Sequence, residues 1–276
     1  MATSTLERKL PPRPDRPPSS QLRDGSRGVR IPLLALVFTL GLALFISIDP
    51  VRPWILLVLA ALVALGADGI IRSHPGGEFH SVADTAPYLF VPVLFTLSAG
   101  LFLEDVVLGY WAAPAVLGAG ALMGATLYGE YVSIDPESES FPFARFVLNV
   151  ITYLAAFGFY AVVYGFDVDL VPASFAVGLV SMLLAIEIFC EAEADPMRSL
   201  VFAAVIGVIA AEARWVLYFI PLEGFLAGVF ILLVFYLTTG VISHYLTEHL
   251  EHSVLLEFAI VTLVGLAIVI GGRSFA

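Results

Sequence analysis

The chain has 276 residues, of which 59% are hydrophobic and only 13% are charged, and its mean hydropathy is +0.95. Soluble domains contain about 45–50% apolar and about 25% charged residues, so this composition excludes a soluble globular protein, which could not cover its surface with polar groups. The net charge of −11 argues against nucleic acid as a partner, and the single cysteine, Cys190, excludes an intrachain disulfide.

Residues 1–30 differ from the rest of the chain, because they hold five prolines, seven basic residues and few large apolar ones. Such a segment cannot bury enough apolar surface to fold. We therefore expect a disordered cytoplasmic tail that lies near anionic lipid headgroups. The PxxP spacing that begins at Pro11 is also typical of ligands of SH3-like grooves.

Nine apolar runs follow, each near the length of about 20 residues that crosses the hydrocarbon core. The runs cover residues 31–48, 54–71, 86–103, 110–128, 144–165, 171–190, 199–219, 224–243 and 254–271. Each should be a helix, because an open strand edge cannot be satisfied in lipid. The predicted fold is an all-α, polytopic transmembrane helical bundle of about nine spans over residues 31–271. Residues 272–276 then form a short extracytoplasmic C-terminus.

Prolines frame the second, fourth and sixth runs at similar spacings of 22, 22 and 24 residues. These pairs are Pro53 and Pro75, Pro114 and Pro136, and Pro172 and Pro196. Tandem two-helix hairpins would produce this recurrence. The need for turns at both faces of a bilayer explains it as well.

The basic residues predict the orientation, since arginine and lysine are enriched in cytoplasmic loops. With the tail inside and nine spans, ten basic residues lie inside and three outside, the latter being Arg52, Arg214 and Arg273. We expect a multi-pass protein of a bacterial plasma membrane, with the N-terminus inside and the C-terminus outside.

Glu212 is the clearest ionisable residue inside a span, and such groups are costly in lipid and suggest function by default. It follows Ala210 and Ala211, whose small side chains allow another helix to approach. We expect Glu212 to face the bundle interior as a proton-titrating or ligand-binding carboxyl. The alternative is a structural carboxyl that is hydrogen-bonded to a neighbouring helix.

The fifth run carries one polar stripe, formed by Asn149, Tyr153, Tyr160 and Tyr164. Their positions fall within about 60° of each other around a helix, so the stripe should face protein or water. It lines a permeation path in one interpretation. In the other it holds helices together by hydrogen bonds.

Acidic residues gather at the predicted inner end of the sixth run, and Glu187 is the one still inside the apolar stretch. Asp68 and Glu130 stand at corresponding places in the second and fourth runs. A shared inner vestibule for cations is one hypothesis. Three unrelated carboxyls that reach toward water from helix ends are the other.

His244, Glu248 and His252 share a helix face at spacings of four residues. Imidazole and carboxylate can bind Zn²⁺ or another divalent ion, although a solvated connector accounts for the same residues. Two GxxxG motifs, formed by Gly120 with Gly124 and by Gly224 with Gly228, indicate close helix packing.

No Walker A motif, dinucleotide-binding glycine fingerprint or GxSxG motif occurs in the sequence, so no cofactor is expected. The sequence favours a non-enzymatic membrane protein. The most specific form of this hypothesis is a carrier or permease for a small solute. The alternatives are a scaffold or accessory subunit, which would bind membrane-protein partners or itself through its glycine faces, and a lipid-modifying enzyme at the cytoplasmic face.

Overall fold

A computed structural model of the chain describes residues 18–48, 52–77, 79–106, 109–166, 168–190, 196–220, 222, 224–246 and 252–273. Within these residues nine long helices and two short ones form a bundle, and no strand is found. The long helices are α1 (Pro18–Ser47), α2 (Pro53–Ile71), α4 (Pro87–Val106), α5 (Ala112–Val132), α6 (Phe141–Gly165), α7 (Leu170–Cys190), α8 (Pro196–Tyr218), α9 (Gly224–Leu246) and α10 (His252–Arg273). The short ones are α3 (Val82–Thr85) and the 3₁₀ turn η1 (Gly109–Trp111).

The predicted all-α bundle is confirmed, since the nine apolar runs coincide with the nine long helices of the described chain. Eight of these helices, α1 to α9 without α3, are long and apolar enough to cross a membrane. In α10 the apolar part described, Leu256–Gly272, is shorter. The protein is therefore a polytopic membrane protein.

The structure differs from the sequence-based expectation at the start of the chain. Helix α1 begins at Pro18, so residues 18–30 are helical and continue the first apolar run toward the N-terminus. Composition alone did not predict this extension, because a segment rich in arginine and glycine lacks the apolar periodicity that marks a helix. Residues 1–17 of the predicted tail lie outside the described residues.

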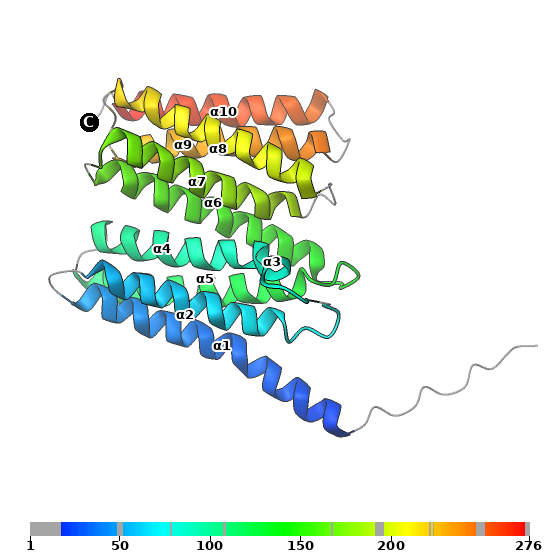
Figure 1. Cartoon of the computed structure of the whole chain (residues 1–276). Coiled ribbons are helices and arrows are strands. Elements are labelled where there is room, and N and C mark those ends of the chain that lie inside the picture. Colours follow the sequence, from blue (N-terminus) through cyan, green and yellow to red (C-terminus); the bar gives the residue numbers. More distant parts are fainter. Residues whose placement is uncertain are drawn as a thin grey trace, which may run out of the picture.

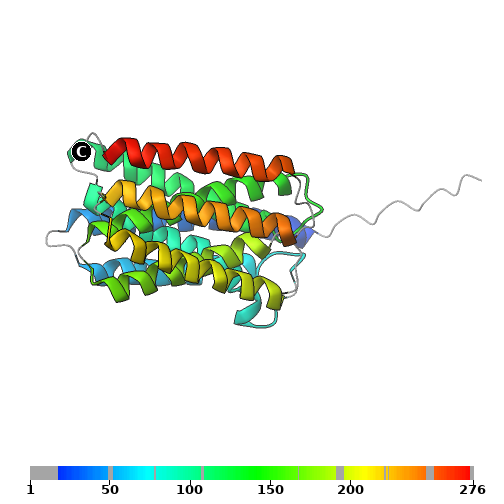
Figure 2. The ribbon, with the colours of Figure 1, turned by 90° about the horizontal axis from the view of Figure 1, so that it is seen from above.

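The long helices run roughly along one common axis (Figures 1 and 2). Helix α1 begins at the end of the bundle where α3 lies, hereafter the α3 end, and α10 finishes at the opposite end (Figure 1). Helix α6 is central, because it packs against α4, α5, α7 and α9. Helix α10 lies at the edge of the bundle beside α9 (Figure 2).

The outer surface of the bundle is apolar, which matches a lipid environment. Large side chains such as Leu57, Leu65 and Phe175 are exposed on the outward faces of the helices. Contiguous exposed apolar surface of this kind is rare on soluble monomers and marks contact with a membrane or a partner. Hydrophobicity therefore does not distinguish the helix faces inside the bundle from those that face lipid. Close packing and polar side chains distinguish them instead.

Glycines set the closest helix crossings. A Cβ atom at Gly228 would lie 2.9 Å from the backbone N and Cα of Ala161, so α9 rests directly on the α6 backbone. Gly224 faces the same stretch of α6. The α7–α8 crossing is equally close, since a Cβ at Gly178 would lie 2.9 Å from the carbonyl oxygen of Gly207.

The GxxxG motif of α5, formed by Gly120 and Gly124, packs against α1. A Cβ at Gly120 would collide with the Thr39 side chain, whereas one at Gly124 would lie 3.6 Å from Ala35 Cβ, an ordinary van der Waals contact. Without a hydrophobic drive between helices in lipid, such close approach supplies the packing energy. The two motifs thus sit at different interfaces and have different tolerance to a methyl group.

We expect Gly228→Ala to lower the free energy of unfolding by about 1–3 kcal/mol, because its methyl group meets backbone that cannot move aside. The matched control is Gly124→Ala, which should leave stability unchanged or slightly raised, since alanine favours helix over glycine. Thermal unfolding of the purified protein in detergent, followed by tryptophan fluorescence, measures both variants. Equal losses in the two variants would contradict the packing described for α6 and α9.

Candidate functional site

A buried ion pair joins the first turns of α6 to the last turns of α7. Arg145 Nη1 donates to Glu187 Oε1 at 3.0 Å, and Nη2 donates to the backbone carbonyl of Glu187 at 3.2 Å. The two side chains are only 5% and 3% exposed. Because Arg145 binds both the side chain and the main chain, it fastens the end of α7 to the start of α6.

A second carboxyl lies in the same buried cluster. Glu130 of α5 is 1% exposed and close enough to Glu187 and Arg145 for electrostatic coupling. Neither of its carboxyl oxygens has a hydrogen-bond partner among the described residues. Two carboxyls are therefore buried near one arginine, and Glu187 is the one that pairs with it. With all three groups ionised this cluster carries one net negative charge that a single proton would cancel.

The polar stripe predicted on the fifth run faces other helices. The Tyr160 hydroxyl is 2.7 Å from the Ser181 hydroxyl of α7, and the Tyr153 hydroxyl is 3.2 Å from the Thr239 hydroxyl of α9. Asn149 lies half-buried one turn before Tyr153. The stripe thus runs between α7 and α9 in the middle of the bundle.

At the far end of α6 the stripe meets a second buried arginine. The Arg214 guanidinium of α8 lies 4.8 Å from the centre of the Tyr164 ring, and Arg214 is 7% exposed. Both residues line a pocket of about 480 Å³ at the end of the bundle opposite α3, together with Val168, Asp169, Leu170 and Tyr218. The pocket is bounded by the end of α6, the start of α7 and the end of α8.

These groups lie along one face of α6, which we name the α6 polar face and define as Arg145, Asn149, Tyr153, Tyr160 and Tyr164 with the partners given above. Its ends are 19 positions apart, or about 28 Å along a helix, which is close to the thickness of a hydrocarbon core. The α6 polar face therefore links two buried arginines near opposite ends of the bundle.

Sequence reasoning treated both arginines only as markers of orientation. Arg145 stands four positions before Asn149 and so continues the stripe by one turn, a signal that the sequence does contain. Arg214 has no such signal, because its partner Tyr164 is 50 positions away. Removing these two buried residues from the count leaves nine basic residues on the predicted inner side and two on the outer side.

The prediction that Glu212 faces the interior is wrong. Glu212 is exposed on α8, and Arg214, two positions away, is the residue that turns inward. Helix α8 packs its small residues against α7, with Gly207 at the crossing, and Glu212 lies about 140° around the helix from Gly207. The small neighbours of Glu212 thus indicated a packed face, but not the one that carries the carboxyl.

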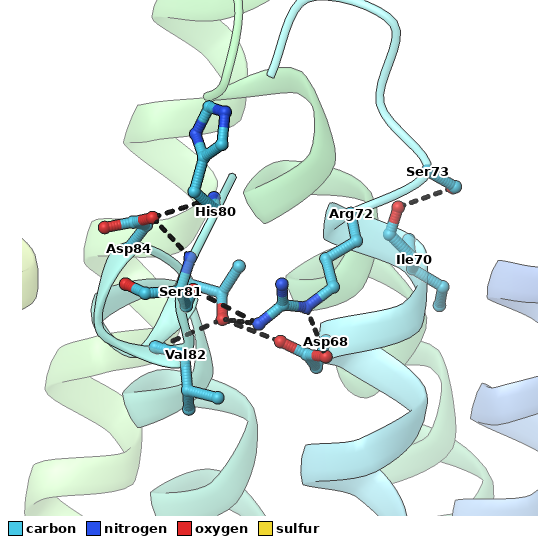
Figure 3. Close-up of polar contacts among 9 residues, drawn as sticks. Asp68, Ile70, Arg72, Ser73, His80, Ser81, Val82 and Asp84 are labelled. Atoms are coloured by element: carbon cyan, nitrogen blue, oxygen red, sulfur yellow. Dashed lines mark hydrogen bonds and ion pairs between the residues drawn. The ribbon is translucent and has the colours of Figure 1, made fainter. Parts of the chain in front are cut away.

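The vestibule hypothesis is only partly matched by the structure. Glu130 and Glu187 lie together, but Asp68 belongs to another cluster, near α3 (Figure 3). There Asp68 Oδ2 accepts a hydrogen bond from Arg72 Nε at 2.7 Å, and Asp68 Oδ1 accepts one from the Thr85 hydroxyl at 2.6 Å. This second cluster holds the end of α2 against α3.

The start of α3 is stabilised by Asp84 (Figure 3). Its Oδ2 accepts hydrogen bonds from the backbone N–H of Ser81 at 2.8 Å and of His80 at 2.9 Å. These bonds, that of Ser81 first, hold the pKa of Asp84 below its usual range. The connection between α2 and α4 is therefore ordered by a carboxylate that stays charged at neutral pH.

The histidine cluster is described only in part. The His244 ring packs edge-on against Phe258 of α10 at 5.7 Å between centroids. Glu248 and the side chain of His252 lie outside the described residues. No group of three metal-ligating side chains occurs within the described part of the chain, and the metal site stays a prediction.

We expect Arg145→Met to destabilise the protein by about 3–5 kcal/mol, because it leaves two carboxyls buried without a counter-charge. The double variant Arg145→Met with Glu187→Met should recover part of this loss. Arg72→Met is the control, since its pair with Asp68 is about a third exposed and such pairs contribute about 1 kcal/mol or less. Chemical unfolding in mixed micelles measures the series, and equal losses for the two single variants would show that the pair of Arg145 is not a buried one.

Comparisons with known proteins place the chain in a family. No curated protein and no solved structure matches it. One family matches residues 29–271, a stretch that begins near the end of the basic segment of α1 and reaches the last turn of α10. Because the match covers most of the chain, this protein belongs to the family described as "Protein of unknown function (DUF5656)".

Proposed function

We propose that this protein is a proton-coupled carrier that moves a small polar solute across the bilayer along the α6 polar face. One observation carries the proposal: a single helix in the centre of the bundle bears polar groups from one buried arginine to another over about 28 Å. Polar and ionisable groups at membrane depth are costly and mark solute or proton pathways.

The cluster of Glu130, Arg145 and Glu187 supplies the coupling in this proposal. A proton that binds Glu187 removes its charge and weakens the bond to Arg145, since hydrogen bonds between ionised partners are the strong ones. The freed guanidinium can then bind an anionic group of the solute. Glu130, which lacks a hydrogen-bond partner in the described structure, is in this proposal the group through which the proton reaches Glu187.

The middle of the path is closed by two hydrogen-bonded pairs of hydroxyls. Tyr160 with Ser181 and Tyr153 with Thr239 connect α6 to α7 and α9. A solute that passes must exchange its own hydrogen bonds for these. Neutral hydrogen bonds contribute about 0.5–1.5 kcal/mol each, which is small enough to break and re-form in a transport cycle.

The test is solute-dependent proton movement in proteoliposomes that contain a trapped pH dye. Pools of amino acids, carboxylic acids, sugars and phosphorylated small molecules are added outside, one class at a time. We expect one pool to acidify the lumen with the wild-type protein, and Glu130→Gln to reduce the rate at least about tenfold, the loss typical of a proton-transfer group. Glu212→Gln is the matched control, because it removes an exposed carboxyl away from the path, and its rate should stay near that of wild type.

The proposal fails if no pool moves protons with the wild-type protein while the protein is folded by circular dichroism. It also fails if Glu130→Gln and Glu212→Gln behave alike. Tyr153→Phe separates the path from the proton cluster, since it removes one hydroxyl of the path and leaves the three charged groups intact. We expect this variant to slow transport while retaining proton binding.

We further propose that the α3 end of the bundle faces the cytoplasm of a bacterial cell. The support is the bias of arginine and lysine toward that end, which persists without the two buried arginines. Cysteine labelling tests it: with Cys190 replaced by serine, a cysteine introduced at Ser274 should react with an impermeant maleimide added outside cells. Labelling only from the cytoplasmic side would refute the orientation.

A second candidate function, a subunit of a membrane complex, is favoured by the position of Glu212. This exposed carboxyl stands on α8 between Val208 and Val216, both half-exposed and apolar. A carboxyl that faces hydrocarbon costs about 2.5–3.5 kcal/mol, and a partner helix would remove that cost. Single-molecule bleaching of labelled protein in nanodiscs distinguishes the two, since an assembly that Glu212→Gln disperses supports the subunit.

A further inference from the structure

The pocket at the end of the bundle opposite α3 contains a cation, Arg214, that has no counter-ion among the described residues. Arg214 makes no ion pair or hydrogen bond with any described residue, and its Nε is buried without a partner. Within the described part of the chain, its one electrostatic contact is with the face of the Tyr164 ring, whose centre lies 4.8 Å from the guanidinium carbon. A cation–π contact contributes about 0.5–2 kcal/mol, which does not offset the several kcal/mol that an ion loses when it leaves water.

The surroundings of Arg214 add to its preference for an anion. Leu170, which lines the pocket, is the first residue of the 21-residue helix α7. The free N–H groups and the dipole at a helix N-terminus attract negative charge. The pocket therefore has two sources of positive potential, of which the buried guanidinium is the stronger and the bidentate one.

One group of opposite sign lines the same pocket. Asp169 is exposed and forms no ion pair with Arg214 within the described residues. The ring of Tyr218, also exposed, stands on the same rim, and aromatic faces attract cations. A ligand with a second negative charge would be repelled by Asp169, whereas one with a neighbouring ammonium group would be held.

We propose that this pocket binds a zwitterionic molecule, with its phosphate or carboxylate on Arg214 and its ammonium group near Asp169. The proposal rests on the proposed function, because it makes the pocket the outer mouth of the α6 polar face and names the class of solute. The same chemistry occurs in a free amino acid or phosphoamine and in the headgroup of phosphatidylethanolamine. The pocket lies where α6 and α8 end and α7 begins, so both sources can reach it.

The free-solute arm measures the binding of O-phosphoethanolamine to the purified full-length protein in detergent by thermal shift at constant ionic strength. We expect a saturable rise in Tm with wild type and an apparent Kd raised about tenfold or more in Arg214→Gln, because a bidentate charged contact contributes about 1.5–3 kcal/mol. Arg198→Gln, which removes an exposed arginine from the other end of α8, should bind like wild type. If Arg214→Gln does not fold, Arg214→Lys replaces it, since lysine keeps the charge and loses the bidentate geometry.

Asp169→Asn separates a zwitterion site from a plain anion site. With this variant we expect weaker binding of O-phosphoethanolamine and stronger binding of inorganic phosphate than in wild type. If Asp169→Asn changes neither preference, the ammonium part of the proposal is overturned. If Arg214→Gln binds O-phosphoethanolamine as tightly as wild type, the anion part is overturned.

The lipid arm uses native mass spectrometry of protein released from nanodiscs of equal parts phosphatidylethanolamine and phosphatidylglycerol. Retention of phosphatidylethanolamine by wild type, reduced in Arg214→Gln, identifies the headgroup as the ligand. A thermal shift without retained lipid identifies a free solute, and neither signal in wild type overturns the proposal. Because both arms measure binding without transport, binding in the absence of flux would refute the carrier and leave the pocket intact.

Discussion

The hydrocarbon of a bilayer offers no hydrogen bonds, so the structure of this protein depends on satisfying most of its polar groups inside the bundle. Helices satisfy the backbone, and many hydroxyls bond to a carbonyl one turn earlier on the same helix, as Ser98 does to Leu94 and Thr126 to Leu122. Other polar side chains contact a neighbouring helix instead, and among these Arg145, Tyr153, Tyr160 and Tyr164 all lie on α6.

Helix α6 can take this role because of where its small residues lie. Ala161 allows Gly228 of α9 to approach its backbone, and the close approach brings Thr239 of the same helix within reach of Tyr153. Two contacts join α6 to α7: Arg145 binds Glu187 near the end of α7, and the Tyr160 hydroxyl contacts the Ser181 hydroxyl. Close packing thus determines which hydroxyls pair, and the pairing in turn keeps polar groups out of lipid.

The two arginines show how burial changes the role of a charge. Each would mark orientation if it lay in a loop, yet each is buried among helices that come from distant parts of the chain. Arg145 has a carboxylate partner, Glu187, and a second carboxyl, Glu130, is buried in the same cluster. Arg214 has an aromatic partner, Tyr164, instead, and this difference makes the pocket at the end opposite α3 attractive to an anion.

The sequence by itself determined the class, the positions of the helices within a few residues except at the start of α1, and the existence of a polar stripe on the fifth span, because length and hydropathy are properties of each helix alone. The tertiary structure decided which face of each helix is inside. In a membrane bundle apolar side chains are acceptable on both sides, so periodicity carries little of that information, and the small-residue face determines the rotation. For this reason Glu212 was expected inside and lies outside, while Arg145 and Glu130, 15 positions apart on separate helices, meet only in the folded bundle.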